Sequence, residues 1–137
     1  MNEIIITIPG VPIAQRRPRF ARRGKYVVTY SDQETEAGRW LLTARQQITE
    51  KIPAEVPIVL SCFFYMPIPK SMSKKKQALL KYHIKTPDIS NLVKFLEDCL
   101  NGELWHDDSQ ISEILTRKVY SDEPRTVICA TWGDEEV

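Results

Sequence analysis

Hydrophobic and polar positions alternate at the start of the chain. Isoleucines occupy every second position of Glu3–Ile8 before the break at Pro9 and Gly10. This pattern predicts a half-buried strand over Glu3–Ile8. Residues 11–25 show no such period and are expected to form an extended arm, which a short strand over Tyr26–Tyr30 follows.

A helical period comes next. The motif Ser31-Asp32-Gln33-Glu34 has the form of a capping box, in which the first and last side chains each bond the other residue's backbone N–H. Apolar residues then recur three or four positions apart as far as Ile48. We therefore expect a helix that opens at this motif and ends near Pro53.

The middle of the chain predicts a buried strand and a short basic helix. Ile58–Met66 is rich in β-branched and aromatic residues and alternates little, which is typical of a strand covered on both faces. Two prolines end it. Ser71 or Ser73 is then expected to cap a lysine-rich helix that runs to about Tyr82.

The clearest helical pattern begins at Asp88, which stands where an N-cap residue belongs. Apolar residues recur at helical spacing as far as Leu100, and Asn101-Gly102 is a typical helix stop. The opposite face of this helix is polar.

Two strands, Ser112–Tyr120 and Thr126–Trp132, are expected to close the chain and to pair with each other around a turn at residues 122–124. The predicted order is strand, strand, helix, strand, helix, helix, strand, strand. It favours an α+β fold in which helices pack on a mixed β-sheet in two layers. A length of 137 residues suits a single domain over residues 1–137.

Composition narrows the class of protein. The 42% hydrophobic and 27% charged residues are ordinary for a globular chain. The longest apolar run, Val56–Met66, is too short to span a bilayer, and the N-terminus lacks the features of a signal peptide. We expect a cytoplasmic protein without a membrane segment. Its three well-separated cysteines are expected to be buried, reduced thiols, because their spacing does not suit zinc.

The net charge of +1 hides a division along the chain. Residues 16–85 contain 15 Lys and Arg against 5 Asp and Glu, a balance of +10, whereas residues 86–137 contain 4 against 12, a balance of −8. Glu3 accounts for the remaining −1. A chain divided in this way is suited to bind a polyanion with one part and cations with the other.

Aspartates mark the predicted helix start and the loop after that helix. Hydrolysis of a phosphodiester needs hard cations, and Mg²⁺ prefers carboxylate oxygens, which Asp88, Asp107 and Asp108 supply if the loop returns to the helix. Lys94 on the polar face is suited to contact the scissile phosphate or steady the leaving oxygen. The plainer alternatives are an N-cap, a turn and a solvated lysine, with His106 as a surface residue.

Six of the ten residues from Arg16 to Lys25 are cationic and none is acidic. Such an arm binds phosphates and releases counterions, and Phe20 and Tyr26 are suited to stack on exposed bases. The alternatives are a solvated loop here and a merely soluble lysine-rich helix. The candidate DNA-binding residues are Arg16, Arg17, Arg19, Arg22, Arg23, Lys25, Lys74, Lys75 and Lys76.

Together these motifs resemble the RusA-type Holliday junction resolvases. That family has the pattern Pro-Asp-x-Asp-Asn-x-x-Lys, a helix, and then x-Asp-Asp-x-Gln. This chain has Pro-Asp-Ile-Ser-Asn-Leu-Val-Lys over residues 87–94 and His-Asp-Asp-Ser-Gln over residues 106–110. An opening Ile-Pro-Gly-x-Pro and an Arg-Pro-Arg within the basic arm also occur in the family, so the resemblance covers nearly the whole chain in order.

The resemblance implies a homodimeric, Mg²⁺-dependent endodeoxyribonuclease, with Mn²⁺ as an expected substitute. Such an enzyme resolves four-way junctions and other branched DNA by paired nicks in recombination and repair, and is often encoded in prophages. By motif position, the resemblance assigns catalytic roles to Asp88, Lys94 and Asp108. It assigns metal binding to Asp88, Asp108 and the adjacent Asp107.

One position departs from the family pattern: Ser90 stands where the second helix aspartate is expected. A hydroxyl coordinates Mg²⁺ weakly and brings no charge, so Ser90 is at most a weak further ligand. Either Asp107 and a water cover the gap, or the chain is a weakened enzyme or a junction-binding protein that does not cut. A Mg²⁺-dependent phosphatase is a third class, which the extended cationic surface disfavours.

Overall fold

The computed structural model describes residues 2–16, 19–24, 26–30 and 34–133. A four-stranded sheet forms its centre, with the strand order β1-β6-β4-β5. β4 pairs with β6 antiparallel and with β5 parallel, and β1 pairs with β6 antiparallel. The predicted α+β fold with a mixed sheet is confirmed. The strands are β1 (Asn2–Pro9), β4 (Ile58–Pro67), β5 (Ile111–Ser121) and β6 (Arg125–Trp132).

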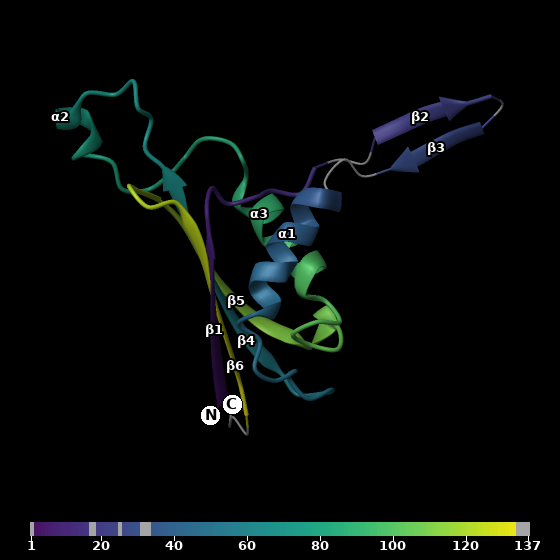
Figure 1. Ribbon diagram of the computed structural model, residues 1–137. Helices are drawn as coiled ribbons and strands as arrows, with labels where there is room; N and C mark the ends of the chain where they lie inside the picture. Colours follow the sequence, from purple (N-terminus) through teal and green to yellow (C-terminus); the bar gives the residue numbers. More distant parts are fainter. Residues whose placement is uncertain (1, 17–18, 25, 31–33, 134–137) are drawn as a thin grey trace.

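Two predictions about these strands were wrong. β5 and β6 do not pair with each other, because β4 lies between them; the turn at 122–124 therefore joins strands that flank a third. β4 is also not covered on both faces, since its burial alternates from Ile58 to Met66. A single layer of helices covers one face of the sheet, as Figure 1 shows.

The helices of this layer are α1 (Glu34–Arg45) and α3 (Ile89–Leu100). They meet where the rings of Trp40 and Phe95 pack edge to face, with 5.8 Å between their centroids. Leu92, Leu96 and Leu100 are fully buried from α3, so its predicted apolar face forms much of the core.

The other two helices, α1 and the lysine-rich helix, are both shorter than predicted. α1 was expected to end near Pro53 but ends at Arg45, and just beyond it the side chain of Gln47 is bound to β1. Its Oε1 accepts the N–H of Thr7 and its Nε2 donates to the carbonyl of Thr7, both at 2.8 Å. The basic helix α2 spans only Lys74–Gln77. Beyond it, the backbone of residues 81–83 bonds to the outer edge of β5 instead.

Part of the basic arm forms a hairpin of β2 (Arg19–Arg23) and β3 (Tyr26–Tyr30), paired antiparallel. Gly24 has a φ of 62° between the two strands, a conformation that glycine adopts without steric cost. The sequence predicted β3 but not β2. The hairpin stands away from the sheet at one end of α1 (Figure 1). The capping box expected before α1 includes residues 31–33, which lie outside the described residues.

The face of the sheet opposite the helices is named here the bare face. Its side chains alternate along each strand with those of the core. Ile5 and Leu115 are more than half exposed on it, and the others lie partly exposed between them. The apolar members of the bare face are Ile5, Val59, Phe63, Tyr65, Leu115, Val119, Val127 and Cys129.

The three cysteines are free, as expected. Cys62 is buried, which raises its pKa to about 12, but Cys99 and Cys129 are only half-buried. Among the helices in the described ranges, none has the length and hydropathy that a membrane crossing requires.

Candidate active site

The first candidate residue, Asp88, stands at the start of α3 as predicted. Its backbone is extended, with φ −67° and ψ 144°, and its carbonyl accepts the N–H groups of Asn91 and Leu92 at 3.1 and 3.2 Å. Its carboxylate makes no capping hydrogen bond and is exposed. The side chain is therefore not committed to the cap and remains open to a ligand.

Asp88 lines a groove of about 650 Å³ together with Ser90. One wall of this groove is the middle of β5, with Thr116 and Lys118, and the other is the segment 82–86. The structure thus brings Asp88 and Ser90 together, at the point where the sequence departs from the family pattern.

The second acidic motif lies in a loop that is firmly held. The indole Nε1 of buried Trp105 donates to Oδ1 of Asp108 at 2.6 Å. The side-chain oxygen of Gln110 accepts the N–H groups of His106 and Asp107 at 3.0 and 3.1 Å. Its amide nitrogen donates to the carbonyls of residues 53 and 56. The hydroxyl of Ser109 also donates to Asp107. Each aspartate therefore has a fixed position.

The surroundings of Asp108 are strongly acidic. Burial raises the pKa of Asp108; the hydrogen bond from Trp105 opposes this change, and the charges of Asp98 and Asp107 add to it. Burial likewise raises the pKa of Glu97, and the charges of Asp108 and Asp98 raise it further. Glu97, Asp98, Asp107 and Asp108 are named here the acidic cluster. Mutual repulsion of this kind is relieved when a cation binds.

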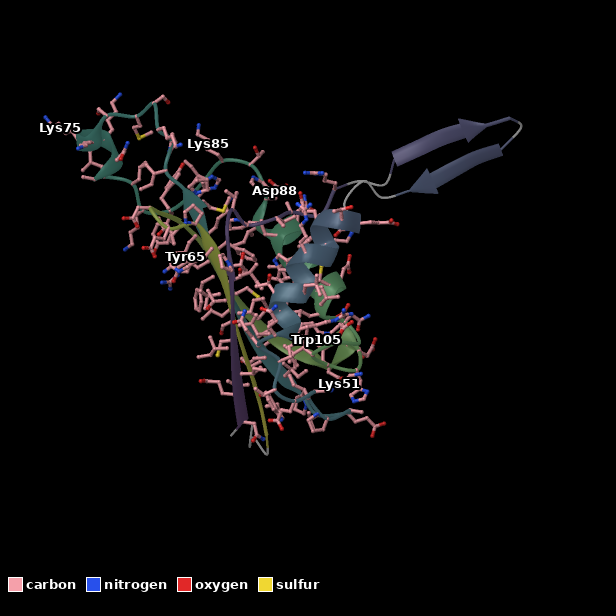
Figure 2. All side chains as sticks on the ribbon, viewed as in Figure 1. Lys51, Tyr65, Lys75, Lys85, Asp88 and Trp105 are labelled. Carbon is pink, nitrogen blue, oxygen red and sulfur yellow. The ribbon has the colours of Figure 1, made fainter. Side chains whose placement is uncertain are left out.

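The two candidate motifs lie at opposite ends of α3. Asp88 and Asp98 are ten residues apart on it, which corresponds to about 15 Å along the helix axis. In Figure 2, Asp88 lies well apart from Trp105, the residue that binds Asp108. The loop does return to α3, but at its C-terminal half. Among the described residues, no three His, Cys, Asp or Glu side chains form a group that could hold a metal ion.

Lys94 lies between these ends and is exposed. Ser90, Lys94 and Asp98 are spaced four residues apart and so follow one stripe of the helix surface. The sequence placed Glu97 and Asp98 on the polar face without assigning them a role. The four-residue spacing from Lys94 was the signal that could have singled out Asp98. His106 is exposed, as expected for a surface residue.

The basic residues gather at the Asp88 end of the molecule. The N–H of Gln15 donates to the carbonyl of Asn91 at 2.9 Å, which ties the base of the arm to the first turn of α3. Arg16 is exposed, with its guanidinium 3.6 Å from Glu36. The lysines at 74–76 are exposed on α2, and Lys75 lies on the opposite side of Asp88 from the hairpin (Figure 2).

The remaining cationic residues of the arm divide into two groups. Arg19, Arg22 and Arg23 lie in β2. Arg17 and Lys25, which were also predicted to bind DNA, lie outside the described residues.

Comparison with known proteins shows the family to which the chain belongs. The sequence profile of the family described as Endodeoxyribonuclease RusA matches residues 9–130. The chain belongs to the RusA endodeoxyribonuclease family. It is also 32% identical over 135 residues to the uncharacterized protein YqaN of Bacillus subtilis (strain 168), an alignment that covers 93% of this chain and 95% of YqaN. The matched range includes both acidic motifs and the basic arm.

Proposed function

We propose that this member of the RusA family is a Mg²⁺-dependent endodeoxyribonuclease that resolves Holliday junctions and other branched DNA by paired nicks. One observation carries the proposal: Asp88, which lines the groove, lies between two basic elements, the hairpin of the arm and α2. Cations on both sides of the groove would hold a DNA backbone across it. With DNA as its substrate, we expect the protein in the cytoplasm of a bacterial host, encoded by the host or by a prophage.

The donor chemistry fits Mg²⁺, with Mn²⁺ as a substitute. Mg²⁺ is commonly bound through one or two carboxylates, with waters and substrate phosphates completing its shell, so a group of three protein ligands is not required. Asp88 would hold the ion in the groove, with Ser90 as a weak neighbour. At the other end of α3, Asp107 and Asp108 would hold a cation whose charge offsets the repulsion in the acidic cluster.

Different residues of the chain would contact the scissile phosphate and position the DNA. When bound, Mg²⁺ supplies an activated water and neutralises charge that develops on the phosphate. Lys94, exposed between the two acidic ends, would contact the scissile phosphate or steady the leaving oxygen. The arm and α2 would position the DNA backbone without reading its sequence.

The position of Ser90 supports a second candidate function. Ser90 lines the groove beside Asp88. The position where the family pattern has a carboxylate therefore belongs to this groove, and in this chain it supplies a hydroxyl instead. A chain that binds metal weakly there would be a weakened nuclease, or a protein that binds junctions without cutting them. The basic elements would serve such a protein equally well.

Paired nicks across a symmetric junction require two active sites, so we also propose that the protein acts as a homodimer. The bare face supports this proposal because its apolar side chains lie opposite the helix layer. Two sheets that pack face to face in this way bury apolar side chains from both. The helices and the Asp88 groove of each copy would then face outward.

The experiment that tests the function compares a four-way junction with a linear duplex of matched sequence, with and without Mg²⁺. A nuclease cuts the junction only when metal is present. Asp88→Asn and Asp108→Asn should each abolish cleavage and leave junction binding intact. Metal-independent binding without cleavage by the wild type would favour the binding protein. Full activity in either variant would remove that aspartate from the site.

A further inference from the structure

Lys118 of β5 is bonded to the segment that leads into Asp88. Its Nζ donates to the carbonyl of Lys85 at 2.6 Å and to the carbonyl of Pro87 at 2.7 Å. Hydrogen bonds from an ammonium group are stronger than those from neutral donors. Two of the three N–H groups of Lys118 therefore hold the backbone on either side of Thr86, directly before the candidate metal ligand.

The held segment has little other support. In the described part of the chain, no backbone–backbone hydrogen bond involves residues 84–87. Ile84 is almost fully exposed, so packing adds little. The next backbone hydrogen bonds along the described chain are those at Asp88, whose carbonyl accepts the N–H groups of Asn91 and Leu92 at the start of α3.

Lys118 itself has a firm base. It lies within β5, where it pairs with Phe64 of β4, and its carbonyl accepts the N–H of His83 at 3.1 Å. Its side chain is half-buried, and no carboxylate within the described ranges lies at ion-pair distance from it. Its charge lowers the pKa of His83, in addition to the larger effect of burial. The two carbonyls are thus the partners of this ammonium group.

We propose that Lys118 is a positioning residue: it fixes the segment 85–87 so that the carboxylate of Asp88 faces the groove. The inference rests on the proposed function for the role of Asp88, but the contact itself does not. Nothing in the spacing of the sequence predicted it, because Lys118 and Asp88 come from different elements. A lysine within a strand is ordinarily read as a solvent-facing residue.

The test compares Lys118→Met, which keeps the stem and removes the donors, with Lys118→Arg, which keeps both charge and donors. Lys85→Met is the matched control, because it removes a positive charge from the same groove and leaves the Lys85 carbonyl in place. Hydrogen exchange is measured peptide by peptide on each full-length, metal-free protein. The amides of Asn91 and Leu92, which are bonded to the carbonyl of Asp88 directly after the held segment, should exchange at least about tenfold faster in Lys118→Met, the ratio expected when a charge-assisted hydrogen bond is removed. They should stay near wild type in the other two variants.

Junction cleavage supplies the second measurement. Lys118→Met should lower kcat, or raise the Mg²⁺ concentration for half-maximal cleavage, by about 10- to 100-fold, as removal of a residue that orients a metal ligand does. The KM for the junction should change little, and Lys118→Arg should restore most of the rate. Lys85→Met measures the effect of one lost charge in the groove, and the loss in Lys118→Met should be clearly larger.

The two proposals fail separately. Unchanged exchange at Asn91 and Leu92 in Lys118→Met would overturn the positioning role, whatever the enzyme does. A wild type that never cuts would overturn the nuclease, while the exchange result would still decide the contact. Should Lys118→Met not fold, Lys118→Gln replaces it, because its shorter, uncharged amide donates weaker hydrogen bonds. Wild-type exchange in that variant would likewise overturn the inference.

Discussion

Asp108 shows how one residue combines a fixed position with an unfavourable charge. Trp105 holds its carboxylate at 2.6 Å, yet burial and the neighbouring carboxylates raise its pKa. The folded, metal-free protein therefore binds protons at Asp108 and Glu97 more tightly than the unfolded chain does. The free energy of unfolding should fall as pH rises from ordinary carboxyl values through these raised ones. Mg²⁺ should offset that loss.

The first prediction follows from this crowding. Asp98→Asn removes a negative charge beside Asp108 and should lower the pKa of Asp108. It should also weaken the pH dependence of stability described above. Carbon-detected NMR titration of the aspartate carboxyls measures the pKa, and Asp122→Asn in the distant β5–β6 turn is the control. An Asp108 pKa that Asp98→Asn leaves unchanged would contradict the existence of the acidic cluster.

The second prediction concerns Ser90, which shares the groove with Asp88. Ser90→Asp adds a full negative charge beside the proposed ion, in a helix turn where the dipole stabilises anions by about 0.3–1 kcal/mol. It should lower the Mg²⁺ concentration needed for half-maximal junction cleavage. Without metal, repulsion from Asp88 should lower stability slightly.

The measurement is cleavage rate against Mg²⁺ at fixed ionic strength, so that screening does not mimic the effect. Asn91→Asp is the control, because it adds the same charge to the same helical turn outside the groove. Identical curves for wild type and Ser90→Asp would mean that Ser90 does not approach the ion. Activity in Ser90→Asp alone, with an inactive wild type, would favour the binding protein.

At the scale of residues, the sequence predicted where the motifs lie along the chain better than which of their residues lie close together in the fold. Asp88 was correctly placed at a helix start because its neighbours in the chain determine that position. The closeness of Asp108 to Asp98, and of Lys118 to the Pro87 carbonyl, depends on how α3 lies against β5. Local spacing does not carry that information.

At the scale of helices and strands, the sequence likewise predicted some features correctly and others wrongly. α3 was predicted from its apolar period and from its Asn101-Gly102 stop, and Gly102 does adopt a φ of 81°. α1 ended at Arg45, and just beyond it the side chain of Gln47 bonds to β1, a strand distant in sequence. β5 and β6 were paired wrongly because a turn signal shows that the chain reverses, but not whether another strand lies between. Local rules thus gave most of the elements but not β2, and tertiary contacts set the partners of the strands.

The third prediction belongs to the arm and its hairpin. Replacing Arg16, Arg17 and Arg19 with Ala should weaken junction binding, because an alanine neither binds a phosphate nor releases its counterion. Each replacement should lower the magnitude of the salt slope by roughly one. Binding measured across a salt series gives the slope. Lys51→Ala, at the end of the molecule away from Asp88 (Figure 2), is the control. An unchanged slope in the triple variant would leave the arm a solvated loop.

Over the whole molecule, folding arranges the two charged halves of the sequence around one helix. The arm and α2 place cations on both sides of the Asp88 end of α3, whereas the acidic cluster occupies its other end. The helix layer carries both ends, and the bare face carries neither. Association through the bare face would therefore leave both acidic ends of each copy open to DNA.

The last prediction tests that association. Leu115 lies on the bare face and is 57% exposed, so Leu115→Glu should leave the folded monomer intact while placing a charge in the proposed interface. It should convert a dimer to a monomer in sedimentation equilibrium and change paired nicks to single ones. Ile114→Glu is the matched control: Ile114 is 45% exposed on the same strand, but its side chain points to the opposite face. A dimer that survives Leu115→Glu, or that Ile114→Glu disrupts equally, would rule out the bare face as the interface.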